Sequence, residues 1–217
     1  AEIWVAAGVY KPGGEIPDTL SRFAVTRSLS IYGGFAGTET ELSERDPAAN
    51  PTILDGDING DDIVGDYTAN KSDNVLHVVY VDSLLQNPVT LDGLVIRNGH
   101  ANDFGDLPFY FEGGAGVWSY SPLRIVGCDI TQNYAGAGAG VLLTGPSTAN
   151  SLIDDCTFTG NASSSQATLY ANGTVNLTVS NSAFSDNSNN RGCAIILYSN
   201  GVTFDNCTFD NNDNPTG

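Results

Sequence analysis

The carboxyl-terminal half of the chain repeats one nine-residue pattern four times. The copies lie at Ile125–Asn133, Ile153–Asn161, Val179–Asn187 and Phe204–Asn212. Their final asparagines are 28, 26 and 25 residues apart, and a period of this size is typical of a solenoid. Within each copy the apolar residues alternate, which is the period of a strand and not of a helix. Stacked strand units of this length predict an all-β solenoid, the parallel β-helix.

A second strand follows in each repeat, at 113–118, 138–142, 166–170 and 192–196. Equivalent residues of successive solenoid repeats stack along the axis. The alignment predicts one small-residue column that allows close packing at a bend, formed by Ala115, Ala139, Ala167 and Cys193. It predicts a large-residue column that fills the core, formed by Val117, Val141, Leu169 and Ile195. Each buried Val or Ile side chain contributes about 1.5–3 kcal/mol.

The asparagines that end the four copies form a third column, Asn133, Asn161, Asn187 and Asn212. Asn tolerates the left-handed backbone conformation that a sharp corner needs. Stacked Asn side chains also hydrogen-bond to one another along the axis. We therefore expect a structural role for all four.

Three of the four cysteines, Cys128, Cys156 and Cys207, share one repeat position, where Ser182 stands in the remaining copy. Neighbouring strands lie about 4.8 Å apart, so Cys128 and Cys156 are near enough for a disulfide. Cys156 and Cys207 are two coils apart, roughly 9.6 Å on the same spacing, which is too far. The sequence leaves two interpretations, a column of buried thiols or a Cys128–Cys156 bridge.

The first half is less regular, but its apolar runs are also bounded by Gly, Pro, Asn or Asp, as strands are. We expect strands at 3–5, 23–25, 29–31, 52–54, 75–81 and 89–96. Leu94 and Ile96 align with the Cys and Phe positions of the later repeats, and 39–45 can form one helical turn. The segment 99–112 exceeds one coil and should protrude. The whole chain, 1–217, is expected to be one domain of a longer or assembled protein.

The chain is strongly acidic, with a net charge of −17 from 25 acidic and 8 basic residues. Binding to nucleic acid phosphates or to an anionic membrane surface needs the opposite sign. No apolar run approaches the roughly 20 residues of a membrane span. The sequence opens in a strand-like segment with no signal peptide, which we interpret as a mature protein or a piece of a longer one. Such acidity suits a secreted or cell-surface protein.

Several segments together resemble a known family. Ile3–Pro12, Ile31–Thr40, the FxxN units and the Gly113-Gly-Ala segment resemble bacterial surface proteins with right-handed parallel β-helix repeats, of the polymorphic outer membrane protein type. The resemblance covers nearly the whole chain. It implies an exported protein that acts in adhesion or as a passive stalk, and it brings no catalytic residues.

The acidic segment Asp55–Asp66 is the best candidate for a metal site. Its positions 1, 3, 5 and 12 carry side-chain oxygens and position 6 is Gly60, which is the spacing of an EF-hand calcium loop. Asp66 stands where Glu is usual and no flanking helices are predicted, so a solvated acidic turn is the alternative. If calcium binds, we expect a structural ion held by the side chains of Asp55, Asp57, Asn59 and Asp66 and by the backbone of Asp61.

Aromatic residues crowd the stretch from 104 to 120. Exposed aromatic rings can stack on sugars or contact a partner, and the candidates are Phe109, Tyr110, Phe111, Trp118 and Tyr120. The alternative is a loop folded back over the coil. A polysaccharide lyase would need a base near calcium, and the sparse basic residues form no cluster in the sequence.

Other candidates favour a structural interpretation. Asp154 and Asp155 form a carboxylate pair, but Asp155 occupies a repeat position that elsewhere holds the turn formers Gly127, Asn181 and Asn206. His77 lies within an expected strand, where packing or exposure is more plausible than catalysis. His100 lies at the start of the protruding segment.

These observations favour a structural or adhesive rod that is not an enzyme. Both ends of the repeat array lack a polar cap, and an open strand edge recruits another strand. Flanking domains or other copies of the chain, stacked end to end into a filament, are the expected partners, and glycans are a further candidate. The alternatives are a carbohydrate-binding module and a polysaccharide-degrading enzyme.

Overall fold

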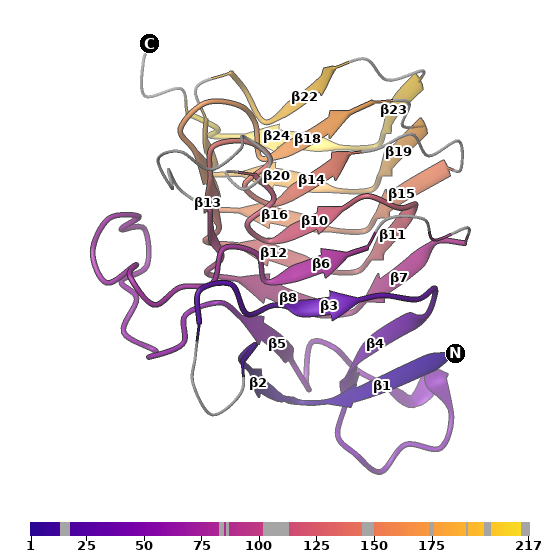
Figure 1. Ribbon diagram of the computed structural model, residues 1–217. Coiled ribbons are helices and arrows are strands. Elements are labelled where there is room, and N and C mark those ends of the chain that lie inside the picture. Colours follow the sequence, from indigo (N-terminus) through magenta and orange to yellow (C-terminus); the bar gives the residue numbers. More distant parts are fainter. Residues whose placement is uncertain are drawn as a thin grey trace.

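The computed structural model describes residues 1–13, 18–82, 85, 87–101, 113–144, 150–173, 176–189, 191–197 and 201–213. Nearly all regular structure in these residues is β-strand, and the strands form four stacked parallel sheets (Figure 1). The predicted all-β parallel β-helix is therefore confirmed.

Two seven-stranded sheets run from one end of the molecule to the other. Sheet A contains, in spatial order, β1 (Glu2–Ala6), β4 (Ser30–Phe35), β7 (Val89–Asp92), β11 (Leu123–Val126), β15 (Asn150–Asp154), β19 (Asn176–Ser180) and β23 (Gly201–Asp205). Sheet B contains β2 (Gly8–Tyr10), β5 (Thr52–Asp55), β8 (Leu94–Arg97), β12 (Asp129–Thr131), β16 (Thr157–Thr159), β20 (Ala183–Ser185) and β24 (Thr208–Asp210).

Two further sheets complete the coils. Sheet C contains β3 (Phe23–Val25), β6 (Val79–Val81), β10 (Val117–Ser119), β14 (Val141–Thr144), β18 (Leu169–Asn172) and β22 (Ala194–Leu197). Sheet D is made of two-residue strands, β9 (His100–Ala101), β13 (Tyr134–Ala135), β17 (Ala162–Ser163) and β21 (Ser188–Asn189). The helical turn expected at 39–45 is present as η1 (Leu42–Glu44).

The core consists of columns of equivalent side chains, as the repeat predicted. In sheet B, Ile96, Ile130, Phe158 and Phe184 stack in register and are fully buried. The rings of Phe158 and Phe184 are 4.5 Å apart and nearly parallel. Leu94 lies directly beside the Cys128 position, as the alignment expected. Each added coil therefore extends one continuous apolar column.

The asparagine column is also confirmed. The Nδ2 group of Asn133 donates to Oδ1 of Asn161 at 3.1 Å, and Asn161 donates to Asn187 in the same way at 3.0 Å. Asn187 continues the ladder to Asn212 at 2.9 Å. Each amide also donates to a backbone carbonyl of the preceding coil, as Asn161 does to Ile130 at 2.8 Å. These contacts satisfy buried polar groups at the corner between sheets B and D.

The left-handed corner conformation does not belong to these asparagines, which corrects the sequence-based expectation. It belongs to the residue before each of them, Gln132, Gly160, Asp186 and Asn211, with φ between 48° and 60°. The reason is that the asparagine side chain must point into the coil to form the ladder, so the preceding residue makes the turn. A second left-handed column, Gly127, Asp155, Asn181 and Asn206, lies between sheets A and B.

All four cysteines are free thiols, so the buried-thiol interpretation holds and the bridge does not. Cys128 and Cys156 are buried, whereas Cys193 and Cys207 are partly exposed. Burial raises the pKa of the Cys156 thiol to about 12. The Sγ atoms of Cys128, Cys156 and Cys207 contact backbone carbonyls of the same and adjoining coils, for example Cys128 with Leu91 O at 3.5 Å.

One register expectation and two strand expectations were wrong. Leu169 pairs with Ala194 and not with Ile195, because the ten-residue spacing from Leu169 to Val179 is repeated from Ala194 to Phe204. The turn before β22 is therefore one residue shorter than its equivalents. Of the expected strand 75–81 only β6 is regular, and the expected strand 89–96 is divided at Gly93, which has φ +67°. The expected protruding loop lies mostly outside the described residues.

Candidate functional site

The segment 56–74 between β5 and β6 is the main departure from the repeat, and it is held in place by a side chain near its start. The carboxylate of Asp57 accepts hydrogen bonds from the backbone N–H groups of Gly60 at 2.6 Å, Asp61 at 3.3 Å and Asp62 at 3.0 Å. Gly60 has φ +77°, which favours glycine. The segment therefore forms a tight turn around the Asp57 carboxylate.

Contacts with later coils dock this segment on the side of the solenoid. The N–H of Gly65 donates to Oε1 of Gln132 at 2.8 Å, and the hydroxyl of Tyr67 donates to the carbonyl of Gly160. On the other side, Nζ of Lys11 donates to the carbonyl of Ile58 at 3.0 Å. The loop thus covers the outer surface of sheet B and its corner with sheet D.

A charged cleft of about 490 Å³ lies beneath this loop. Three of the eight basic residues of the chain line it, Lys11, Lys71 and Arg97. Arg97 pairs with Asp55 at 2.7 Å and Lys71 with Asp62 at 2.7 Å. These three residues are far apart in the sequence and form no cluster there, and the fold brings them to one cleft from separate coils.

The electrostatics of the cleft follow from burial. The Asp62 carboxylate is 7% exposed, and desolvation raises its pKa although Lys71 and Asn74 both contact it. Asn74 Nδ2 donates to Asp62 at 2.8 Å and to the carbonyl of Asn98 at 2.8 Å. The Lys71–Asp62 pair is therefore largely shielded from solvent, whereas in the second pair Asp55 is 5% exposed and Arg97 is 35% exposed.

Two of the predicted metal ligands, Asp55 and Asp66, have hydrogen-bond partners of their own. The Asp55 carboxylate contacts Arg97 and, at 2.8 Å, Nδ2 of Asn98. The Asp66 carboxylate accepts from the N–H groups of Thr68 at 2.8 Å and Ala69 at 3.0 Å, which lowers its pKa to about 2. The structure therefore does not bring Asp55 and Asp66 together with the remaining expected ligands.

A different acidic cluster is formed by Asp57, Asp61 and Asp73, whose carboxylate oxygens lie within 4.8 Å of one another. Asp73 also accepts the N–H of Asn59 at 2.8 Å. Carboxylate oxygens are the ligands that calcium and magnesium prefer, so this set fits a hard divalent cation. Sequence spacing alone could not include Asp73, because only the return path of the loop brings it back to Asp57.

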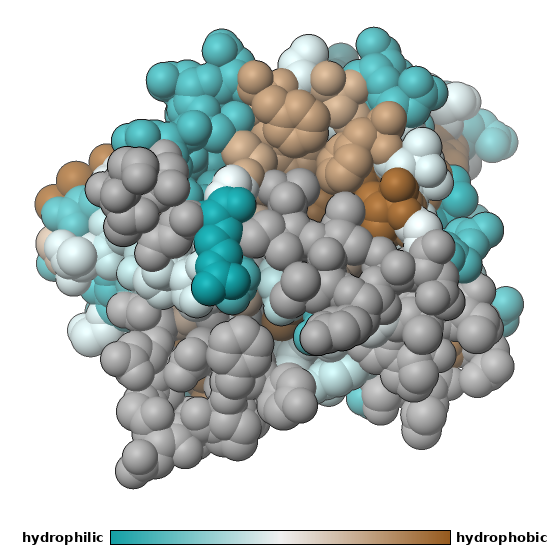
Figure 2. Space-filling view, turned by 90° about the horizontal axis from the view of Figure 1, so that it is seen from above, coloured by the Kyte–Doolittle hydropathy of each residue, from teal (hydrophilic) through white to brown (hydrophobic). Residues whose placement is uncertain are grey.

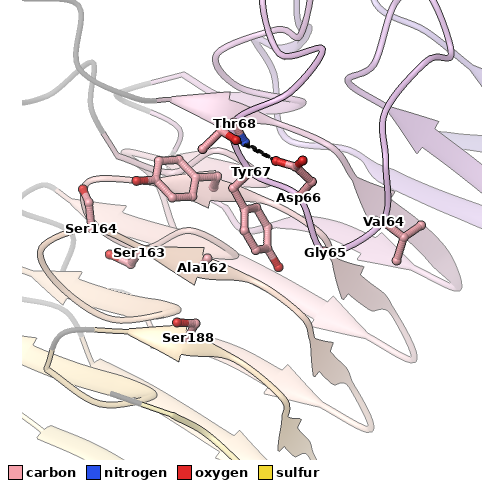
Figure 3. A pocket seen from close by; sticks show the side chains of 10 residues that line it. Val64, Gly65, Asp66, Tyr67, Thr68, Ala162, Ser163, Ser164 and Ser188 are labelled. Carbon is pink, nitrogen blue, oxygen red and sulfur yellow. Dashed lines mark hydrogen bonds between the residues drawn. The ribbon is translucent and has the colours of Figure 1, made fainter. Parts of the chain in front are cut away.

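A second, open groove of about 630 Å³ adjoins the cleft (Figure 3). It is lined by 64–68 of the loop and by Tyr134, Ala162, Ser163, Ser164 and Ser188 of the sheet D coils. The Tyr67 and Tyr134 rings stack at 5.6 Å, and His100 stacks on Tyr134 at 4.9 Å. This groove of hydroxyl groups and aromatic rings was not expected from the sequence, because Tyr134 lies outside the aromatic-rich stretch.

The expected aromatic ligand-binding residues are only partly described. Phe109, Tyr110 and Phe111 lie outside the described residues. Trp118 is 4% exposed and packs against His77, Tyr80 and Tyr120, and its Nε1 donates to Oγ1 of Thr144 at 3.3 Å. Tyr120 is partly exposed. Trp118 is therefore a packing residue and does not offer an open ring face.

The surroundings of the two histidines and of the pair Asp154–Asp155 indicate structural roles. His77 is 2% exposed, contacts the carbonyl of Gly114 at 3.2 Å, and has a pKa lowered to about 4 by burial. His100 has a pKa lowered to about 4 for the same reason. Asp155 adopts the left-handed turn conformation, with φ 54°. Asp154 accepts from Ser180 at 2.7 Å and Asn181 at 2.9 Å, which lowers its pKa.

Comparison with known proteins agrees with this geometry. Residues 77–216, more than half of the chain, match the family described as the right-handed β-helix region. The chain belongs to this family, which confirms the general resemblance and the right-handed coil. No curated protein and no solved structure matches the chain. Among the described residues, no helix has the length and apolar character needed to span a membrane.

Proposed function

We propose that the protein is a structural rod that is secreted or held at the cell surface, where it presents its loops in an adhesive or scaffolding role. The observation that carries this proposal is the continuity of the coil. The apolar column of sheet B runs without interruption from β8 to β24, and the asparagine ladder runs from Asn133 to Asn212. On such a solenoid, equivalent surface positions of successive coils are separated by the distance between neighbouring strands.

The right-handed β-helix fits a structural rod and also an enzyme. The pairing and burial of the titratable groups favour the structural rod over the enzyme. In the cleft, Asp55 pairs with Arg97 and Asp62 pairs with Lys71. His77, which does not line the cleft, is buried against Trp118. A general acid or base needs access to a substrate proton. We therefore propose that the protein does not degrade polysaccharides, and product formation from polyuronates, with or without calcium, would contradict this.

We also propose a structural divalent cation, calcium, on the loop 56–74. The support is the convergence of Asp57, Asp61 and Asp73. Like charges this close repel one another, and a bound cation would remove that repulsion and hold the loop against the coils. The ion has a stabilising role and no part in a reaction.

Location is the direct test of the proposed function. Antibodies raised against the folded chain should label intact cells that produce the native protein, or detect the protein in their medium. Protease added outside the cells should remove the signal. Labelling that requires permeabilised cells would contradict the proposal.

A second candidate function is glycan binding, and the Tyr67–Tyr134 groove is the observation that favours it. Tyrosine rings and hydroxyl groups are suited to the apolar faces and hydroxyl groups of sugars. If glycans bind there, Tyr134→Ala should lower retention on a glycan array, whereas Tyr120→Ala should not. The reverse result would place glycan binding near Tyr120, and retention that neither substitution changes would exclude both places.

A further inference from the structure

The ion pair between Lys71 and Asp62 removes both of its charges from solvent. Lysine and aspartate side chains are almost never fully buried, and Figure 2 shows, in a view from above, hydrophilic residues along much of the outer rim of the coil. The Lys71 side chain is 10% exposed and the Asp62 side chain 7%. Burying an ion pair costs desolvation energy that the attraction of the two charges does not always repay. A reaction that removes both charges would therefore be favoured at this place.

The contact between the two groups is close but is not a hydrogen bond. Nζ of Lys71 lies 2.7 Å from Oδ1 of Asp62. Oδ1 is nevertheless a buried atom without a hydrogen-bond partner among the described residues, so the amine approaches it outside hydrogen-bonding geometry. The other oxygen, Oδ2, accepts a hydrogen bond from Nδ2 of Asn74 at 2.8 Å. The amine thus adjoins the carboxylate oxygen that no hydrogen bond holds.

The surrounding loop holds the carboxylate in place. The backbone N–H of Asp62 donates to Oδ2 of Asp57 at 3.0 Å, and Asn74 also donates to the carbonyl of Asn98 in the next coil at 2.8 Å. Two groups that a fold keeps in contact react far faster than the same groups free in water. The low exposure of the pair also limits the access of water, which would reverse a condensation.

We propose that the loop 56–74 forms a spontaneous amide crosslink between the side chains of Lys71 and Asp62. Nζ forms a bond to Cγ of Asp62, the bond from Cγ to Oδ1 breaks, and Oδ1 leaves as water with two of the three ammonium protons. The hydrogen bond from Asn74 stabilises the negative charge that develops on Oδ2 during the addition. The amide is uncharged, as the ion pair was in sum, and the reaction needs no oxidant or further reactant.

The other basic residues of the cleft do not meet the same conditions. Lys11, the second of the two lysines in the chain, donates from Nζ to the carbonyl of Ile58 at 3.0 Å and forms no ion pair with a described carboxylate. Arg97 pairs with Asp55, but its guanidinium group stays protonated in proteins and does not act as a nucleophile. The proposed crosslink is therefore specific to Lys71.

The crosslink would fasten the part of the loop that docks on later coils. The ring that it closes spans 62–71 and includes Gly65 and Tyr67, which contact Gln132 and Gly160. A covalent bond between distant residues removes conformations from the unfolded chain. The docked loop should therefore resist local unfolding.

Trypsin digestion followed by mass spectrometry tests the crosslink. Trypsin cleaves this part of the sequence after Arg45, Lys71 and Arg97, but it does not cleave after a lysine whose amine is acylated. The native chain should therefore give one peptide, 46–97, that is lighter than its sequence by one water. Two separate peptides, 46–71 and 72–97, in its place would overturn the proposal. A joined peptide that has lost ammonia would also overturn it, because the bond would then be to Asn74.

Substitutions at the two ends of the bond complete the test. Lys71→Arg keeps the positive charge but cannot form the amide, so it should give the two separate peptides without loss of water. Asp62→Ala should do the same. Lys11→Arg is the matched control and should leave the joined peptide unchanged. A loss of water from the region 46–97 in Lys71→Arg or Asp62→Ala, or separate peptides in the control, would overturn the assignment to this pair.

Discussion

Individual residues at the corners of the coil determine how tightly it turns. Gly127, Asp155, Asn181 and Asn206 share a left-handed backbone with φ near 50°. This conformation is strained for most residues but mild for Gly, Asn and Asp. The repeat therefore restricts residue type here for reasons of backbone geometry, even where the side chain faces solvent.

Asp155→Val should lower the free energy of unfolding by about 1–2 kcal/mol, because a β-branched side chain is strained in the left-handed region. Asp155 is exposed, so the loss of side-chain contacts is small. Asp155→Gly is the control and should remain near the native value. Urea denaturation measures both, and equal stabilities would show that the corner tolerates any residue.

Asn161→Ala should lower the free energy of unfolding by more, roughly 3 kcal/mol, because it leaves buried partners without hydrogen bonds. The Asn161 side chain is fully buried, donates to Ile130 and Asn187, and accepts from Asn133. Thr157→Ala, at an exposed residue of the adjacent strand, should change stability by less than about 0.5 kcal/mol. Similar midpoints for the two variants would contradict a stabilising role for the ladder.

Acidification should destabilise the fold in the window from about pH 6.5 to 4. Burial lowers the folded-state pKa of His77 from 6.5 to about 4, so the unfolded state takes up the proton first. The stabilisation is complete above pH 6.5 and declines as pH falls, by roughly 3 kcal/mol in all for this residue. The measurement is the free energy of unfolding against pH. His77→Gln should flatten the slope, and an unchanged slope would contradict this.

At the scale of elements, the loop 56–74 differs in kind from the strands. Strand positions recur every coil, whereas this loop occurs once and is held by contacts with coils far away in the sequence. Its path brings Asp57, Asp61 and Asp73 together in one acidic cluster. The expected ligands Asp55 and Asp66 are not part of this cluster. The loop is therefore the element whose stability should respond to a ligand.

Calcium should raise the melting temperature, since a ligand that binds only the folded state stabilises it. At a free concentration 100 times its dissociation constant the gain is about 2.7 kcal/mol. Asp61→Asn with Asp73→Asn should remove the effect. Asp66→Asn, in the same loop but outside the cluster, should retain it. A thermal melt with calcium and with chelator makes the comparison, and equal midpoints in the native chain would exclude the site.

At the scale of the whole molecule, stability should decline from the middle toward the ends. Central strands such as β12 and β16 have a paired strand on each side, whereas β24 is paired on one side only among the residues that the structure describes. Amide hydrogen exchange should therefore be slowest in β12 and β16 and fastest in β24 and β1. Equal protection of β12, β16 and β24 would contradict this gradient.

The fold was predictable because residues that are one repeat period apart in the sequence of a solenoid contact each other directly. Phe158 and Phe184 are 26 residues apart and stack directly, so aligning the repeats located the core column. The alignment failed at β22, where a turn one residue shorter displaced the register. It also could not separate the side chain that forms the ladder from the residue before it that adopts the left-handed turn.

The sequence by itself therefore determined the parallel coil, its core columns and the asparagine ladder, because these depend on contacts between residues one period apart. Only the tertiary structure decided what the loop 56–74 brings together. Tyr67 contacts Gly160 and Gly65 contacts Gln132, and no repeat relates these positions. The path of a single non-repeating segment over the coil is set by side-chain docking, so its charged cleft, open groove and acidic cluster emerge only in three dimensions.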